Sequence, residues 1–126
     1  MAKIALSTPD APAALGPYSQ AIKVGNMVFC SGQLGIDPAT GKIADGVEAQ
    51  AEQAFKNIAH VLAEAGATLD DVVKTTVLLA DIADFSAVNE VYASKFNEPY
   101  PARSAFQAAA IPAGGLVEIE VIAVLP

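Results

Sequence analysis

Three segments of this 126-residue chain are apolar at both odd and even positions, which is typical of β-strands covered on both faces. They are VVKTTVLLA (72–80), SAFQAAA (104–110) and VEIEVIAV (117–124). The rest of the sequence predicts only two helices, and two helices can cover one face of a sheet. We therefore expect the second face to be buried against other copies of the same chain.

Two segments have the three- and four-residue spacing of apolar positions that is typical of amphipathic helices. The first covers residues 47–65 and is followed by Gly66, which favours a helix end. The second begins near Asp84, a residue suited to the N-cap position, and ends before Pro99. Its inward positions are predicted to be Phe85, Val88, Asn89, Tyr92 and Phe96.

The other regular elements are predicted strands. A short strand at 3–6 precedes a proline-rich loop, and a hairpin turns at Gly25-Asn26 between QAIKVG and MVFCSGQ. Two more strands flank the turn IPAGGL at 111–116. The order strand, strand, strand, helix, strand, helix, strand, strand predicts one α+β domain over residues 1–126, with a mixed sheet and both helices on one face.

Composition excludes several classes of function. Seven Lys and Arg residues against 14 Asp and Glu residues give a formal net charge of -7, which disfavours nucleic acid as a partner. No window approaches the ~18 uninterrupted apolar residues of a membrane span, and the N-terminus lacks a signal peptide's apolar segment, so we expect a cytoplasmic protein without a membrane partner. With a single cysteine, Cys30, the chain cannot form an internal disulfide. With a single histidine, His60, as well, it cannot assemble a Cys/His zinc site, so no metal is expected. Cys30 is predicted to be an inert buried thiol, and His60 to be solvated on the polar face of the first helix.

The last two predicted strands carry three charged residues that are costly to bury: Arg103, Glu118 and Glu120. If Ala110 faces Val117 across the turn, these three residues and Gln107 share the side that faces the partner subunit. One interpretation is a buried or interfacial ion pair that only fixes the strand register. The other is a small-anion site, in which arginine binds a carboxylate and a glutamate of raised pKa exchanges protons near neutrality. The residues alone leave both interpretations open.

Five segments, in this order and spacing, resemble the RidA family, also called the YjgF or reactive intermediate deaminase family. They are GPYSQAI, MVFCSGQ, VKTTVLLADIADFSAVNEVY, PARSAFQ and VEIEVIAV, and the resemblance covers nearly the whole chain. It implies a chorismate-mutase-like α+β fold that assembles as a homotrimer, with ligand sites between neighbouring subunits. It also implies hydrolysis of 2-imino acids such as 2-iminobutanoate and 2-iminopropanoate to 2-oxo acids and ammonia, without metal or cofactor. The imines come from pyridoxal-phosphate enzymes, and their removal protects other such enzymes.

The resemblance further implies a set of site residues, namely Tyr18, Ser31, Gly32, Asn89, Arg103 and Glu118. In this interpretation Arg103 holds the substrate carboxylate, and Glu118 transfers protons through an ordered water. Tyr18 and Asn89 of a neighbouring subunit shape the pocket wall, while Ser31 and Gly32 contribute polar groups near the carboxylate. Glu120 is assigned to structure, and Ala105 stands where several relatives have a cysteine, which argues against a thiol at the site.

Two alternatives belong to other functional classes. A non-catalytic trimeric sensor would bind 2-oxo acids without turning over imines. An endoribonuclease or translation inhibitor is suggested by names used within the family, but the net charge of -7 and the lone His60 disfavour it.

Overall fold

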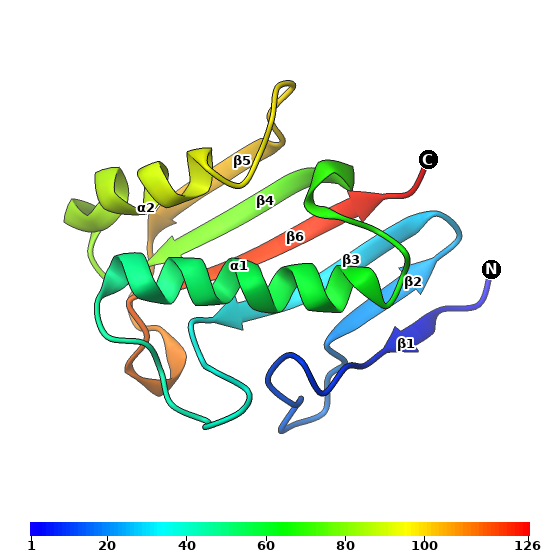
Figure 1. The fold of residues 1–126 in the computed structure, drawn as a ribbon, viewed down its shortest axis with the longest axis horizontal. Coiled ribbons are helices and arrows are strands. Elements are labelled where there is room, and N and C mark those ends of the chain that lie inside the picture. The colour runs from blue at the N-terminus through cyan, green and yellow to red at the C-terminus, as the bar shows by residue number, and fades with distance from the viewer.

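Both helices lie on the same face of a six-stranded sheet, as Figure 1 shows. The structure is a computed structural model that describes all of residues 1–126. The strands are β1 (Ile4–Leu6), β2 (Ala21–Val24), β3 (Met27–Leu34), β4 (Val72–Leu79), β5 (Ala102–Gln107) and β6 (Val117–Val124). The helices are α1 (Val47–Ala63) and α2 (Phe85–Ala93). The expected α+β class, element order and one-sided helix layer are confirmed.

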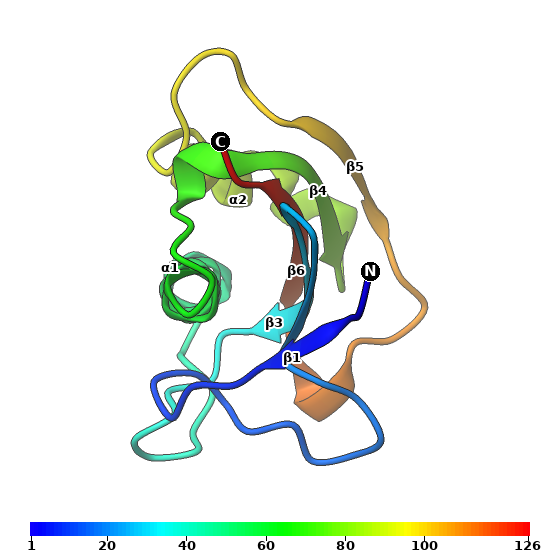
Figure 2. The same ribbon diagram turned by 90° about the vertical axis from the view of Figure 1, so that its right-hand side faces the viewer.

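The sheet is mixed, with the strand order β1-β2-β3-β6-β4-β5. Neighbouring strands run antiparallel except β4 and β5, which are parallel and are connected through α2. A parallel pair needs such a crossover, and the helix it contains packs on one face of the sheet. The edge view in Figure 2 shows α1 and α2 on the concave side of the curved sheet and neither helix on its convex side.

Local sequence accounts for the bounds of α1. Its buried face consists of apolar residues at helical spacing together with two amides, Gln50 and Asn57. After the last helical residue, Gly66 takes a left-handed conformation with φ of 74°. This conformation lets the Ala67 N–H donate to the Leu62 carbonyl at 3.0 Å, which closes the helix end. The Asp84 side chain, in contrast, makes no capping hydrogen bond to α2, and Asp81 caps the preceding short 3-10 turn instead.

The core lies between the helices and the odd-numbered positions of β6. Val117, Ile119, Val121 and Ala123 are all at most 2% exposed, and they pack with Phe55, Ile58 and Leu62 of α1. Glu118 and Glu120 alternate with them and therefore point to the uncovered face of the sheet.

The expected hairpin between the last two strands is wrong. β4 lies between β5 and β6, and it pairs with both. The crossover through α2 puts β5 on the outer edge, and residues 108–116 pass over β4 to reach β6. The register consequently places Arg103 beside Thr75 and Val121, on the helix-covered face, whereas Glu118 is beside Leu78 and Phe106 on the other face.

The uncovered face, which we call the open face, is largely apolar. Its exposed or half-buried apolar residues are Ile22, Val24, Met27, Phe29, Leu78, Phe106, Ile122 and Val124. Phe29 is 41% exposed and Phe106 is 50% exposed in the single chain. Large contiguous apolar surfaces of this kind are typical of protein interfaces.

Candidate active site

Arg103 lies on the edge strand β5 with its guanidinium held against α2. Its Nη1 donates to Asn89 Oδ1 at 2.5 Å. The guanidinium carbon lies 4.6 Å from the centre of the Tyr92 ring and 5.3 Å from that of Phe85, which is the geometry of a cation–π contact. Asn89, Tyr92, Arg103 and Tyr100 line a pocket of about 400 Å³.

Glu118 lies in a different pocket, at the end of β3. This pocket has a volume of about 590 Å³, and its lining includes Tyr18, Gly32, Leu34 and Pro112 together with Glu118. The Glu118 side chain passes directly over Gly32, where an added β-carbon would be 2.9 Å from Glu118 Cδ. The sheet irregularity between Cys30 and Gln33 occurs at the same place, so β3 bends where it meets the carboxyl group.

The surroundings of Glu118 favour its neutral form. Burial raises the pKa of the Glu118 carboxyl above its ordinary value, and the like charge of Glu120 raises it further. Both effects disfavour the ionised form, so the proton is held to a higher pH than on an exposed glutamate. A carboxyl group whose pKa is raised in this way takes up and releases a proton closer to neutrality than an exposed glutamate does.

The loop that carries Tyr18 is fixed by two polar side chains. The buried Gln20 accepts from Thr8 N–H at 2.7 Å and donates to the carbonyls of Thr8 and Pro12. Ser31 Oγ donates to the Ser19 carbonyl at 2.6 Å. The Ser31 hydroxyl therefore holds the loop beside β3, and Gly32, not Ser31, lines the pocket of Glu118.

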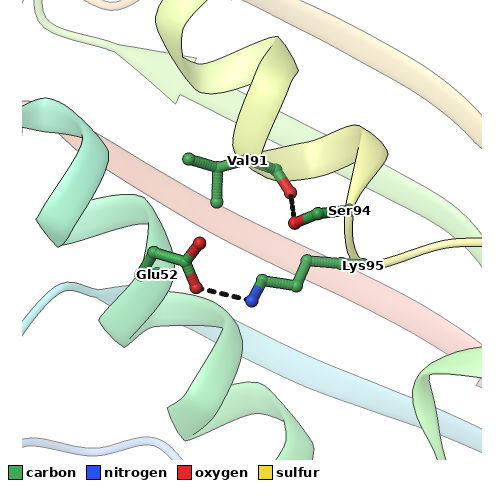
Figure 3. Close-up of polar contacts among 4 residues, drawn as sticks. All are labelled: Glu52, Val91, Ser94 and Lys95. Atoms are coloured by element: carbon green, nitrogen blue, oxygen red, sulfur yellow. Dashed lines mark hydrogen bonds and ion pairs between the residues drawn. The ribbon is translucent and has the colours of Figure 1, made fainter.

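Neither Arg103 nor Glu118 forms an ion pair within the chain. The one ion pair joins Lys95 to Glu52 of α1, on the side away from the sheet, as Figure 3 shows. Exposed pairs of that kind contribute about 0–1 kcal/mol to stability. The form of the register-fixing alternative in which Arg103 pairs with Glu118 or Glu120 inside one chain is therefore absent.

The predicted site residues thus form two groups. Arg103 and Asn89 are together, and Tyr18, Gly32 and Glu118 are together. Strand spacing puts the Cα atoms of Arg103 and Glu118 roughly 14 Å apart, with their side chains on opposite faces of the sheet. The expectation that they share one face is wrong, because the intervening β4 reverses the assumed parity. The expected separation of Asn89 from Arg103 is also wrong, since the two residues are bonded within one chain.

Cys30 and His60 lie apart from both groups. Cys30 is buried, as expected, and burial raises the pKa of its thiol to about 12. His60 is partly exposed on the polar face of α1, and its Nδ1 lies 2.9 Å from the Asp10 carbonyl. It therefore links α1 to the N-terminal loop. No group of three or more His, Cys, Asp or Glu residues is arranged to hold a metal ion, and no helix is long and apolar enough to cross a membrane.

Several residues near the site were not predicted from the sequence. Tyr92 belongs to the inward stripe of α2, but the stripe gives no sign that its ring also contacts Arg103. Thr75, fully buried in β4, bonds to the Tyr92 hydroxyl at 2.8 Å. Gln20 looks like any polar residue that begins a strand, and only the folded loop reveals its role.

The fold and these two groups define a small α+β protein that carries an uncompensated arginine and a half-buried carboxyl group on opposite faces of one sheet. The profile of the Endoribonuclease L-PSP family, which includes the YjgF and RidA proteins, matches residues 8–125. The chain therefore belongs to this family.

Relatives of known name are similar over most of the chain. The 2-iminobutanoate/2-iminopropanoate deaminase of Capra hircus is 57% identical over 120 residues, which is 94% of this chain and 88% of that protein. The chloroplastic Reactive Intermediate Deaminase A of Arabidopsis thaliana is 56% identical over 98% of this chain, and the chain spans 66% of that longer protein. The crystal structure of RidA from the Antarctic bacterium Psychrobacter sp. superposes with a TM-score of 0.94 at 53% identity, covering 97% of this chain and 99% of that one.

Proposed function

We propose that this protein hydrolyses reactive 2-imino acids, such as 2-iminobutanoate and 2-iminopropanoate, to 2-oxo acids and ammonia, and thereby limits damage to pyridoxal-phosphate enzymes. The observation that carries the proposal is the Arg103 guanidinium, oriented by Asn89 and Tyr92 and uncompensated by any carboxylate of its own chain. Such a planar cation suits the carboxylate that all 2-imino acids have. The deaminase names of relatives that are more than half identical support the same reaction.

The complete site would form between copies of the chain. Arg103 and Glu118 cannot reach one small ligand from opposite faces of one sheet, but Arg103 of one copy can meet Glu118 of another across an interface. The apolar open face supports such an assembly, because exposed Phe29 and Phe106 would leave water there. We propose a homotrimer, in which each of three interfaces holds one site.

In the proposed mechanism, Arg103 binds the substrate carboxylate and holds the C=N carbon near Glu118 of the adjacent copy. The Glu118 carboxylate takes a proton from a water molecule as the water oxygen adds to the C=N carbon. Glu118 returns that proton to the nitrogen, which gives a tetrahedral amino alcohol. The same carboxyl group then carries the hydroxyl proton to the nitrogen, so the C–N bond breaks, ammonia leaves and the carbonyl of the 2-oxo acid forms. Positioning together with one proton-transfer group, the latter worth ~100- to 10,000-fold, is sufficient for an imine that also hydrolyses unaided.

The test is the lifetime of 2-iminobutanoate, generated in situ by an amino-acid oxidase and trapped with semicarbazide. The wild-type protein is expected to reduce trapping, and Arg103→Ala and Glu118→Gln are expected to lose most of this effect. Unchanged trapping with the wild-type protein would reject deamination. Full activity of Arg103→Ala would remove the carboxylate anchor from the mechanism.

The same preparations separate the alternatives. A sensor would bind 2-oxobutanoate through Arg103 without turning over the imine. A ribonuclease would cleave RNA, and the Arg103→Ala variant would retain that activity. The net charge of -7 favours a small anion held at one arginine over a polyanion. A cytoplasmic location stays a prediction, which cell fractionation tests, because one similar protein is chloroplastic by name.

A further inference from the structure

The Arg103 side chain is exposed and lies on an edge strand, where a long side chain is normally mobile. Three contacts restrain it: the bond to Asn89 Oδ1 and the two aromatic rings of Phe85 and Tyr92. Of the two rings, Tyr92 is the nearer, at 4.6 Å from the guanidinium carbon. The question is what keeps that ring in place.

Tyr92 is restrained on several sides. Its ring centre lies 4.8 Å from that of Phe96 and 5.9 Å from that of Phe55, within the buried aromatic cluster between the helices. Its hydroxyl lies 2.8 Å from Thr75 Oγ1, a fully buried group. Thr75 is also the register partner of Arg103 on the adjacent strand. The strand pair that positions the arginine backbone therefore also anchors the ring beneath its guanidinium.

We propose that Tyr92, anchored by Thr75, is a positioning residue that fixes the Arg103 guanidinium for carboxylate binding. This inference rests on the proposed function, in which Arg103 binds the substrate. The ring orders the guanidinium when the chain folds, so less conformational entropy is lost when the ligand binds. Asn89 occupies one N–H of the fork, and the remaining N–H groups are left for the carboxylate.

The test uses Tyr92→Leu, which removes the ring, and Phe96→Leu as its matched control. Phe96 is as buried as Tyr92 and belongs to the same cluster, but it does not contact Arg103. Tyr92→Leu is expected to raise KM for 2-iminobutanoate and Kd for 2-oxobutanoate by about 5- to 10-fold, with kcat within about 2-fold. In Phe96→Leu an apolar side chain still packs against the Tyr92 ring and the Thr75 bond still anchors the ring hydroxyl. Phe96→Leu is therefore expected to lower Tm similarly but to leave KM and Kd within about 2-fold. Equal changes of KM in both variants would overturn the proposal.

Two milder variants cover the case in which Tyr92→Leu fails to fold. Tyr92→Phe and Thr75→Val each remove one partner of the same hydrogen bond, so each is expected to raise Kd about 2- to 3-fold. The double variant is expected to show no further increase, because the two changes remove one interaction. Independent, additive effects, or none, would contradict the coupling.

A readout that needs no ligand separates this proposal from the proposed function. The Arg103 Nε–H group, followed by 15N relaxation, is expected to be ordered in the wild type, and its order parameter is expected to fall below about 0.6 in Tyr92→Phe or Tyr92→Leu. An unchanged order parameter would overturn the positioning role even in an active deaminase. If the order parameter falls in the Tyr92 variants but the wild-type protein hydrolyses no imine, the positioning role of Tyr92 holds and only the deaminase function is rejected.

Discussion

The two faces of the sheet hold their charged residues in different ways. On the helix-covered face, Arg103 contacts Asn89 and Tyr92, and every buried polar side-chain atom of the chain has a hydrogen-bond partner. On the open face, Glu118 and Glu120 lie two residues apart, Glu118 beside Leu78 and Glu120 beside Thr76, and neither has an ion pair. The polar groups of the helix-covered face are therefore held by contacts within the chain, whereas the apolar open face resembles one side of a protein interface.

This difference indicates where the chemistry lies. The oriented Arg103 guanidinium is suited to bind a carboxylate. The Glu118 carboxyl, whose pKa is raised, is suited to exchange a proton with a molecule bound nearby. Because a single chain keeps these two groups apart, we expect a second copy to bring them together.

The largest effect is expected from a charge on the open face. Phe29→Arg would leave an unpaired arginine at the proposed interface, which costs several kcal/mol, so the assembly is expected to dissociate and activity to fall by roughly 100-fold or more. Phe29 is 41% exposed in the single chain, so the fold itself is expected to survive. Light scattering gives the mass, and circular dichroism checks the fold. Ala63→Arg, exposed on the opposite side at the end of α1, is the control for the added charge. If Phe29→Arg remained oligomeric and active, the open face would not be the interface between copies.

A smaller effect is expected at the glycine beneath Glu118. In Gly32→Ala the new β-carbon would be 2.9 Å from Glu118 Cδ, and the flexible carboxyl group would move aside. Activity is expected to fall by about 10- to 100-fold, because displacement by about 1 Å is costly in catalysis, while Tm changes little.

Gly35→Ala is the contrasting variant, because its β-carbon would lie 2.4 Å from the backbone of Gln50 in α1. Backbone cannot move aside as a side chain can, so Tm is expected to fall with a loss of about 1–3 kcal/mol. If Gly32→Ala lost stability to the same degree and kept its activity, the proposed role of Glu118 would be wrong.

The sequence patterns predicted the parts of the fold that depend on neighbouring residues. The periodicity of 47–65 and the turn at Gly25-Asn26 gave α1 and the β2–β3 hairpin close to their observed bounds. The position of β4 between β5 and β6 was not predictable in this way, because strands that are apolar on both sides do not specify which strand they pair with. One wrong pairing then reversed the face assigned to Arg103 relative to Glu118. The resemblance supplied candidate residues, but the grouping of Asn89 with Arg103 required the folded structure.

A still smaller effect is expected from Glu120→Gln on the pH dependence. The like charge of Glu120 raises the pKa of Glu118, so its removal lowers that pKa. The acid limb of kcat/KM, which reports the ionisation of Glu118 in the free enzyme, is therefore expected to move to lower pH. Glu48→Gln in the first turn of α1 serves as a control that removes one charge far from the open face. A limb that moves to higher pH, or moves equally in both variants, would contradict this assignment.

The smallest effect is expected at Cys30. Burial raises the pKa of its thiol to about 12, so almost none of the reactive thiolate is present at pH 8. The native protein is expected to resist iodoacetamide at pH 8 and to react fully in guanidinium chloride, as measured by intact mass. Rapid alkylation of the native protein would show that β3 opens near Gly32.

The central claim is that Arg103 and Glu118 act from different copies of the chain, and complementation tests it most directly. Arg103→Ala and Glu118→Gln, each inactive alone, are co-expressed with different tags, and mixed oligomers are purified. In every mixed trimer, one of the three interfaces joins an intact Arg103 to an intact Glu118, so about one third of wild-type activity is expected to return. Mixed oligomers that remain as inactive as their parents would place both groups on one chain and contradict the account.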